Sequence, residues 1–316
     1  MILTVTLNAA LDRTLAVPNF EVGFRHRATE TLSLPGGKGV NVARTVKTLG
    51  QPVIATGFLG GPTGDRILAD LTREGILCDF VRIEQESRTS TAVIDPATNT
   101  ATEINEYGPE ISPRELELMY EKLSYLSKAA AVVVLAGSLP RGLEPSIYGS
   151  LLSLLNSLGA VTLFDTFGDP LRQGIKAGPD VVFPNQEEAE MVIGYEFSGD
   201  DDFLAAARGL RELGAGSVVI KSRKGCAAQI VGKDGRVRSY LGRAPQVTEV
   251  SSVGSGDALV GGYAEAMRRG LEPAECLRLA LACSAANTLR AGAGVFYTED
   301  LDRLLELVDI EEVPAE

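Results

Sequence analysis

Residues 251 to 262 read SSVGSGDALVGG, in which Gly254, Ser255 and Gly256 directly precede Asp257. Two glycines around a small polar residue favour a sharp turn whose backbone N–H groups point outward. The apolar residues that follow recur with helical spacing, so the turn leads into a helix N-terminus with unpaired N–H groups and a partial positive charge. The stretch therefore predicts a site for an anion.

Asp257 places a second negative charge at this anion site. Phosphoryl transfer needs N–H donors around the phosphate, a cation, and a carboxylate that takes the proton from the attacking hydroxyl. The amides of Gly254, Ser255 and Gly256 can be the donors and Asp257 the base, because the acceptor alcohol then lies between the two anions. An aspartate that only caps the helix is the alternative, and both interpretations stand on this stretch alone.

A second glycine-rich stretch, LPGGKGVNVAR, spans residues 34 to 44. Gly36 and Gly37 allow the backbone to approach a ligand closely, and Lys38 adds a positive charge. Asn41, in the first turn of the predicted helix 39–50, has an amide that can bind sugar hydroxyls. An ordinary glycine turn before a helix is the alternative.

These loops require strands and helices to position them. Helix-periodic segments, among them residues 112–127 with Ser112 as N-cap and Pro113 at the first position, alternate with apolar runs. This alternation predicts an α/β fold, a three-layer sandwich with a mainly parallel sheet. The apolar runs are residues 2–7, 53–58, 131–136, 160–165, 180–184 and 217–221.

Two segments, 13–34 and 88–106, interrupt the alternation with Thr- and Val-rich residues of period two. We expect them to form extra antiparallel strands, a small β lid over the carboxyl ends of the parallel strands, where open α/β sheets bind ligands. The main domain is then residues 1–12, 35–87 and 107–316. A hairpin without a ligand role is the alternative, and the edges of such a lid predict a homodimer.

The composition of this 316-residue chain, with a net charge of −12, argues against nucleic acid or an acidic membrane as partner. The four cysteines are scattered and only one histidine, His26, is present, which does not favour a zinc site or a disulfide framework. The N-terminal residues lack the pattern of a signal peptide, and the longest apolar run is too short to span a bilayer. We therefore expect a cytoplasmic protein.

Five stretches together resemble the PfkB branch of the ribokinase-like carbohydrate kinases, and within it the 1-phosphofructokinases and tagatose-6-phosphate kinases. The resemblance covers nearly the whole chain, with the motifs in the family's order. The stretches are LNAALD at 7–12, GGKGVNVAR at 36–44, TEINEYGPEIS at 102–112, AGSLP at 136–140 and SVGSGDA at 252–258.

The resemblance implies roles for individual residues. It makes Asp257 the catalytic base and the amides of Gly254, Ser255 and Gly256 the anion hole. Asp12, Gly37 and Asn41 match the positions that hold the sugar hydroxyls, and Lys38 fits a role beside the substrate. Arg27, Arg88 and Ser138 match the groups that bind the phosphate already on the sugar, with Arg25 as a helper. Positions that match nucleotide-binding residues are Asn185, Ser222, Gly225, Gly256 and Asn287, of which Asn287 falls near the family's adenine pocket. Asn185 and Glu188 match the N-x-x-E motif that organises Mg²⁺, mainly through water.

The predicted nucleotide loop, IKSRKGC at 220–226, departs from the family's usual T-L-G-x-x-G. It has Ser222 at a glycine position and positive charges at Lys221, Arg223 and Lys224. These three residues either contact a triphosphate or form a solvated turn, and we favour the turn. His26, between two arginines, is interpreted as a bystander because the proposed mechanism needs no imidazole.

The resemblance and the site chemistry together predict an ATP- and Mg²⁺-dependent kinase that phosphorylates a ketohexose monophosphate. Fructose 1-phosphate, converted to fructose 1,6-bisphosphate, is the foremost candidate, with tagatose-6-phosphate kinase and 6-phosphofructokinase as alternatives. A kinase for an unphosphorylated sugar or nucleoside is disfavoured by the basic residues near the lid. A non-catalytic sugar-phosphate sensor is the alternative of another class. Hydrolase chemistry is weaker, because AGSLP lacks the G-x-S-x-G pattern.

Overall fold

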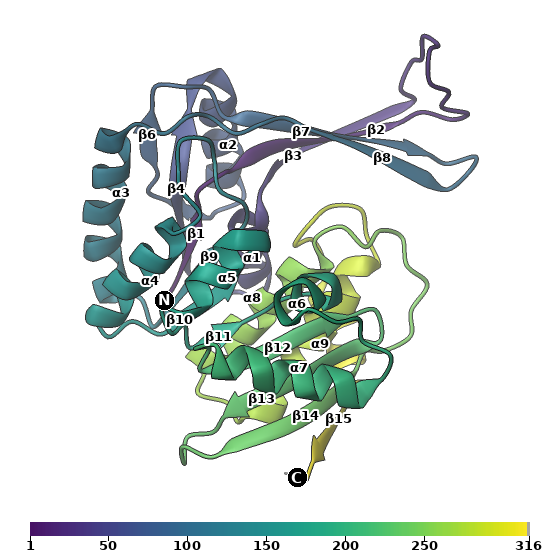
Figure 1. Ribbon diagram of the computed structural model, residues 1–316. Coiled ribbons are helices and arrows are strands. Elements are labelled where there is room, and N and C mark those ends of the chain that lie inside the picture. Colours follow the sequence, from purple (N-terminus) through teal and green to yellow (C-terminus); the bar gives the residue numbers. More distant parts are fainter. Residues whose placement is uncertain (315–316) are drawn as a thin grey trace.

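The computed structural model describes residues 1–314 and contains a large, mainly parallel sheet (Figure 1). The spatial order is β15 (Asp309–Val313), β14 (Val237–Arg243), β13 (Gly225–Val231), β12 (Ser217–Ser222), β11 (Val181–Val182), β10 (Thr162–Asp165), β9 (Val132–Ala136), β1 (Ile2–Thr6), β4 (Val53–Gly60) and β5 (Leu77–Cys78), with β6 (Val81–Ile83) also paired to β4. In this order the strands from β12 onward run parallel, and the six apolar runs predicted as strands lie among them. The strands β13, β14 and β15 extend the sheet in antiparallel fashion.

Helices cover both faces of this sheet, because alternate residues of the buried strands point to opposite sides. In β1, Ile2 enters one hydrophobic core, and Leu3 and Val5 enter the other. One core packs against α1 (Lys38–Thr48), α2 (Gly61–Arg73), α8 (Ser255–Arg268), α9 (Pro273–Thr288) and α10 (Thr298–Leu305). The other packs against α3 (Pro113–Leu126), α4 (Ile147–Ser157), α5 (Gly168–Ile175), α6 (Gln186–Ile193) and α7 (Asp200–Glu212). The predicted three-layer α/β sandwich is confirmed.

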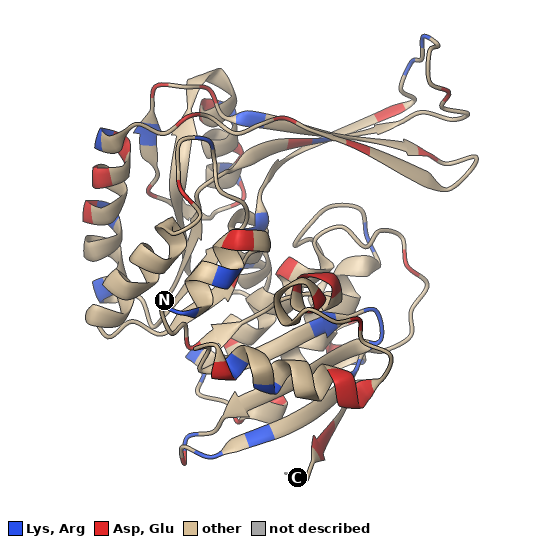
Figure 2. Ribbon diagram, in the orientation of Figure 1, with Lys and Arg blue, Asp and Glu red and all other residues tan. Residues whose placement is uncertain are grey.

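A local sequence signal marks the start of α3. Ser112 caps α3 with the predicted capping box, in which its side chain accepts from the Glu115 amide and Glu115 accepts from the Ser112 amide. Acidic and basic residues are interspersed along this helix (Figure 2).

Within residues 1–314, no helix has the length and apolar character needed to cross a membrane.

A second sheet of four strands projects from the main body (Figure 1). Its order is β3 (Glu30–Gly36), β2 (Ala10–Ala16), β7 (Arg88–Asp95) and β8 (Thr100–Asn105). The expectation that all these strands pair antiparallel is wrong, because β2 and β7 are parallel. Both leave the main body in the same direction, while β3 and β8 are the returning arms of the two hairpins. That this sheet is a lid, with the domain bounds given above, remains a prediction.

Candidate active site

The N-terminus of α8 begins at a left-handed glycine. Gly254 has φ 78°, and a Cβ built on it would lie 2.3 Å from the Cβ of Ala293, so both its conformation and its close packing require glycine. Ser255 and Gly256 form the first turn, and Asp257 follows with 8% of its surface exposed. The predicted arrangement of a glycine turn, a helix N-terminus and a carboxylate is therefore present.

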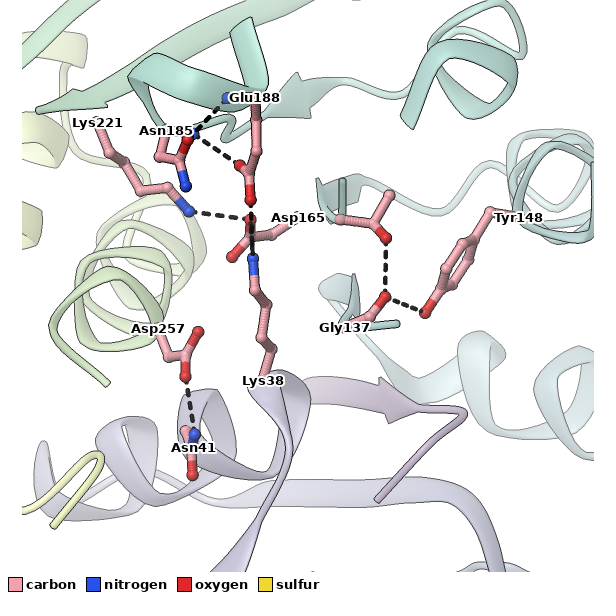
Figure 3. Close-up of polar contacts among 10 residues, drawn as sticks. Lys38, Asn41, Gly137, Tyr148, Asp165, Asn185, Glu188, Lys221 and Asp257 are labelled. Carbon is pink, nitrogen blue, oxygen red and sulfur yellow. Dashed lines mark hydrogen bonds and ion pairs between the residues drawn. The ribbon is translucent and has the colours of Figure 1, made fainter. Parts of the chain in front are cut away.

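Asn41 binds this carboxylate directly. Its Nδ2 donates to Asp257 Oδ2 over 2.8 Å (Figure 3), which brings the two glycine-rich stretches of the sequence together. Burial raises the pKa of Asp257 to about 6. The positive charge of Lys38 opposes this rise, and the negative charge of Asp165 adds to it. The carboxylate is thus mostly ionised at neutral pH, with a pKa close to that of an effective general base.

Arg44 was not among the predicted site residues, although it is the last residue of the stretch GGKGVNVAR at 36–44. This buried guanidinium donates to Asn41 Oδ1 at 3.3 Å, to the carbonyl of Ala293 at 2.9 Å and to that of Pro35 at 2.9 Å. It also forms a bidentate ion pair with Glu74. Arg44 therefore ties the start of α1 to the base of β3 and to the loop that packs on Gly254.

Asp165, at the end of β10, is a second residue that the sequence analysis missed. Its carboxylate is fully buried, and its Oδ1 accepts from Lys38 Nζ at 3.1 Å and from Lys221 Nζ at 2.9 Å (Figure 3). These ammonium groups hold the pKa of Asp165 below its usual value even though burial acts to raise it. The interpretation of Lys221 as part of a solvated turn is wrong, because only 11% of its side chain is exposed.

Asn185 and Glu188 form a capping box at the start of α6. Asn185 Oδ1 accepts from the Glu188 amide at 2.8 Å, and Glu188 Oε2 accepts from the Asn185 amide at 2.8 Å. The other carboxylate oxygen, Oε1, lies 3.7 Å from Lys38 Nζ (Figure 3). Helix capping accounts for the N-x-x-E spacing, and one oxygen remains directed toward the site.

The residues present fit a hydrated magnesium ion better than a tightly caged one. Within residues 1–314, no three His, Cys, Asp or Glu side chains are grouped closely enough to hold a metal directly. Mg²⁺ prefers oxygen ligands and usually keeps several waters beside one or two carboxylates and substrate phosphates. Glu188 Oε1 is the carboxylate oxygen available for that role, which remains a prediction.

Asp12, Arg88 and Ser138 gather at the base of the small sheet. Arg88 donates from Nε to the Asn8 carbonyl at 3.3 Å, and the Asn8 amide donates to Ser138 Oγ at 3.0 Å. Asp12 lies over Gly36, where a Cβ would be 1.9 Å from its Oδ2. Burial raises the pKa of Asp12 to about 6, against the opposing charge of Arg88.

Arg27 is not part of this group. It lies in the exposed loop beyond the far ends of β2 and β3, two residues before Thr29, whose amide donates to the Ala16 carbonyl. Arg88 instead pairs with Ala10 at the near end of β2, roughly 20 Å away along an extended strand. Within one chain, Arg27 therefore does not reach the group around Arg88, and its role in binding the sugar phosphate remains a prediction. Arg25 lies in the same exposed loop.

Two of the predicted nucleotide residues, Ser222 and Gly225, lie at a different part of the sheet edge. Ser222 and Gly225 pair at the tight turn between β12 and β13, where Arg223 and Lys224 are exposed. A surface cavity of about 630 Å³ lies beside this turn. Its lining residues include Arg223, Lys224, Arg243 and the segment 244–247.

Asn287, predicted near the adenine, is fully buried. Its Nδ2 donates to the Val253 carbonyl at 2.8 Å and its Oδ1 accepts from the Gly294 amide at 2.7 Å. It therefore ties Val253, the residue before Gly254, to the loop at Gly294, whose neighbour Ala293 packs on Gly254. Contact with a nucleotide remains a prediction.

Comparison with known proteins agrees with this fold and identifies the family. The description "pfkB family carbohydrate kinase" fits residues 5–300. A 1-phosphofructokinase of Borreliella burgdorferi is 30% identical over 313 residues, 99% of each chain. A tagatose-6-phosphate kinase of Staphylococcus epidermidis is 30% identical over 99% of this chain and 100% of its own. The structure of phosphofructokinase-2 from Escherichia coli in complex with substrates and products covers 97% of this chain and 98% of its own, with 26% identity and a TM-score of 0.90.

The fold and the site define a ribokinase-like kinase. The chain belongs to the pfkB family of carbohydrate kinases, which confirms the resemblance noted in the sequence.

Proposed function

We propose that the protein transfers the γ-phosphoryl group of ATP to a free primary hydroxyl of a ketohexose monophosphate, with fructose 1-phosphate as the foremost substrate and fructose 1,6-bisphosphate as the product. The observation that carries the proposal is the contact between Asn41 and Asp257 at the N-terminus of α8. It joins an anion site, a carboxylate and an amide suited to sugar hydroxyls in one place. The 1-phosphofructokinase relative supports the choice of sugar.

Asp257 acts as the general base in this reaction. At neutral pH its carboxylate is mostly ionised, because its raised pKa is still only about 6. It accepts the proton of the sugar hydroxyl as the hydroxyl oxygen attacks the phosphorus in line. The bond from that phosphorus to ADP breaks, and the amides of Gly254, Ser255 and Gly256 stabilise the charge on the phosphoryl oxygens.

The group at the base of the small sheet binds the sugar phosphate. Arg88 offers a planar fork of donors that matches a phosphate, and Ser138 adds a hydroxyl. Asn8, which touches both, keeps them on one side of the site. Asp12 and the backbone at Gly37 then face the sugar hydroxyls. Closure of the small sheet as a lid excludes water, which limits hydrolysis of ATP.

ATP enters from the edge where β12 and β13 turn. The cavity beside this turn is lined by the positive side chains of Arg223, Lys224 and Arg243 and by two acidic residues, Glu249 and Asp200, of which Asp200 binds Arg243. A protein with a net charge of −12 needs such local positive charge to attract a polyanion. Asn185 and Glu188 would hold Mg²⁺ mainly through water, and the ion would supply positive charge that neutralises the phosphates.

Tagatose 6-phosphate is the second candidate substrate, supported by the Staphylococcus epidermidis relative. An assay of ADP release across fructose 1-phosphate, fructose 6-phosphate, tagatose 6-phosphate and the unphosphorylated sugars separates the alternatives. We expect the highest kcat/KM with fructose 1-phosphate. Equal activity on free fructose contradicts the proposal, and ligand binding without ADP release supports the sugar-phosphate sensor.

We also propose a cytoplasmic homodimer that pairs through the small sheet. Leu32 and Ile94 are 38% and 36% exposed and lie on the same face as Asp12, since side chains two residues apart in a strand share a face. Burying this face between two copies removes apolar surface from water. Sedimentation of the protein and of a Leu32→Asp variant tests it, and a monomeric wild-type protein contradicts it.

A further inference from the structure

Two lysines from separate elements meet on a single carboxylate oxygen. Lys38, from the start of α1, and Lys221, near the end of β12, both donate to Asp165 Oδ1 (Figure 3). The other oxygen, Oδ2, is buried and has no hydrogen-bond partner among the residues that the structure describes. The family motif around Lys221 departs from the usual pattern, so this arrangement is a feature of this chain rather than a role implied by the resemblance.

A structural ion pair does not require the second lysine. One ammonium group neutralises one carboxylate, and each ammonium has three N–H donors. Within residues 1–314, the only hydrogen bond from Lys221 Nζ is the one to Asp165. Moving charges out of water is costly, so a buried ion pair is weak evidence for a stabilising role. Lys221 therefore keeps donors for another anion.

The position of Lys221 indicates which anion this is. A Cβ built on Gly256 would lie 3.6 Å from Lys221 Nζ, so the ammonium lies against the first turn of α8. The Gly256 amide belongs to the proposed anion hole, and Asp257 is the next residue. A phosphoryl group held by these amides is within reach of Lys221.

Each of the two lysines is needed to balance the negative charge of the carboxylates around them. Asp165, Glu188 and Asp257 face Lys38, and the first and last of these also face Lys221. When all five groups are ionised, this cluster holds one more negative charge than positive charge. Removal of one lysine doubles that excess and opposes the approach of a phosphoryl group.

We propose that Lys221 is a catalytic residue that, with Lys38, stabilises the negative charge on the transferring phosphoryl group, and that Asp165 is a positioning residue that directs both ammonium groups. This inference rests on the proposed function. The lysines neither gain nor lose a proton: the bond between phosphorus and ADP breaks, the bond from the sugar oxygen to phosphorus forms, and Asp257 takes the hydroxyl proton.

The first test compares Lys221→Met with Lys233→Met in the full chain. Lys233 is an exposed lysine whose ion pair with Glu272 lies elsewhere on the surface, so it is a matched control. We expect Lys221→Met to lower kcat about 10- to 100-fold with KM for the sugar phosphate changed less than about threefold, because the contact strengthens in the transition state. A kcat within twofold of wild type for the folded variant overturns the inference.

Lys221→Arg separates charge from structure. It keeps a positive charge beside Asp165, so we expect it to recover part of the lost kcat while its thermal unfolding matches that of wild type. A stably folded Lys221→Arg enzyme that is no faster than Lys221→Met contradicts the role of the charge.

Asp165→Asn and the double variant Asp165→Asn/Lys221→Met test the positioning role. If Asp165 acts through Lys221, the loss of kcat in the double variant is smaller than the product of the two single losses. Losses that multiply contradict the positioning role of Asp165.

A different result shows that the proposed function, and not the role of Lys221, is at fault. A wild-type protein that phosphorylates none of the ketohexose phosphates contradicts the proposed substrate. The lysine is then tested by the slow transfer from ATP to water, which passes through the same kind of phosphoryl transition state. We expect Lys221→Met to slow this hydrolysis as well, and an unchanged rate overturns the inference.

Discussion

Asn41 Nδ2 donates to Asp257 Oδ2 over 2.8 Å and thereby joins the first turns of α1 and α8, whose residues are 216 positions apart in the sequence. Arg44 donates to the oxygen of the same amide, so the nitrogen is the atom that faces the carboxylate. A hydrogen bond to an ionised carboxylate favours that form. The contact therefore both directs Asp257 and opposes the rise of its pKa that burial causes.

Replacement of Arg44 by Met should destabilise the protein. The carboxylate of Glu74 and the carbonyls of Pro35 and Ala293 lose a donor, at a cost of roughly 2–4 kcal/mol in the free energy of unfolding. Urea unfolding measures this cost. Arg66→Met is the control, since the exposed Arg66 pairs loosely with Asp70 at 3.6 Å and should change stability by less than about 1 kcal/mol. Equal effects in the two variants contradict the role given to Arg44.

Gly254→Ala should lose both stability and activity, and Gly270→Ala provides a matched comparison. Both glycines have positive φ, 78° and 69°, so alanine strains the backbone by about 1–2 kcal/mol at either position. Only at Gly254 does the new Cβ meet Ala293, whereas nothing lies within 4 Å at Gly270. We expect kcat to fall in Gly254→Ala alone. Full activity in that variant argues against an anion hole at this turn.

The pH profile of kcat/KM reports on Asp257. Because its pKa is raised to about 6 by burial, with Lys38 opposing that rise, the carboxylate becomes protonated below that pH. We expect kcat/KM to fall about tenfold per pH unit there. The negative charge of Asp165 also raises this pKa, so Asp165→Asn should move the fall to lower pH. Using one substrate for both proteins cancels the substrate's own ionisation. A shift to higher pH contradicts the assignment.

Arg88→Ala should weaken the binding of the sugar phosphate far more than that of ATP. Loss of the guanidinium removes a charge-assisted contact to the sugar phosphate, so KM for that substrate should rise about 10- to 100-fold while KM for ATP changes less than about threefold. Steady-state kinetics with each substrate varied in turn measures both constants. Arg82→Ala, which removes an exposed arginine that pairs with Asp65, is the control. Equal increases in both KM values mean that Arg88 does not bind the phosphate.

Much of the architecture was predictable because local patterns carry it. The buried parallel strands are continuous apolar runs, and the capping box at Ser112 marks the start of α3. The pairing of β2 with β7 was not predictable from period-two patterns, since alternation indicates a strand but not the direction of its neighbour. That direction depends on where each strand leaves the main sheet.

In the site, glycine-rich loops were recognisable, whereas partners distant in sequence were not. Asp257 and Asn41 stand in glycine-rich stretches that the sequence singles out, and the family resemblance gave both residues their predicted roles. Asp165 stands at the end of a strand without a glycine turn, and its role is visible only when Lys38 and Lys221 converge on it. Arg27 illustrates the opposite case, because its residue type suits a phosphate but its loop lies at the far end of the small sheet, away from Arg88 of the same chain.

The most direct test of the account is the rate of phosphoryl transfer by Asp257→Asn to fructose 1-phosphate, measured beside wild type in single-turnover experiments. The amide keeps the shape of the side chain but accepts no proton. We predict wild-type thermal stability and a rate lowered by roughly 10²- to 10⁴-fold. A folded Asp257→Asn enzyme that transfers the phosphoryl group at nearly the wild-type rate contradicts the assignment of Asp257 as the base.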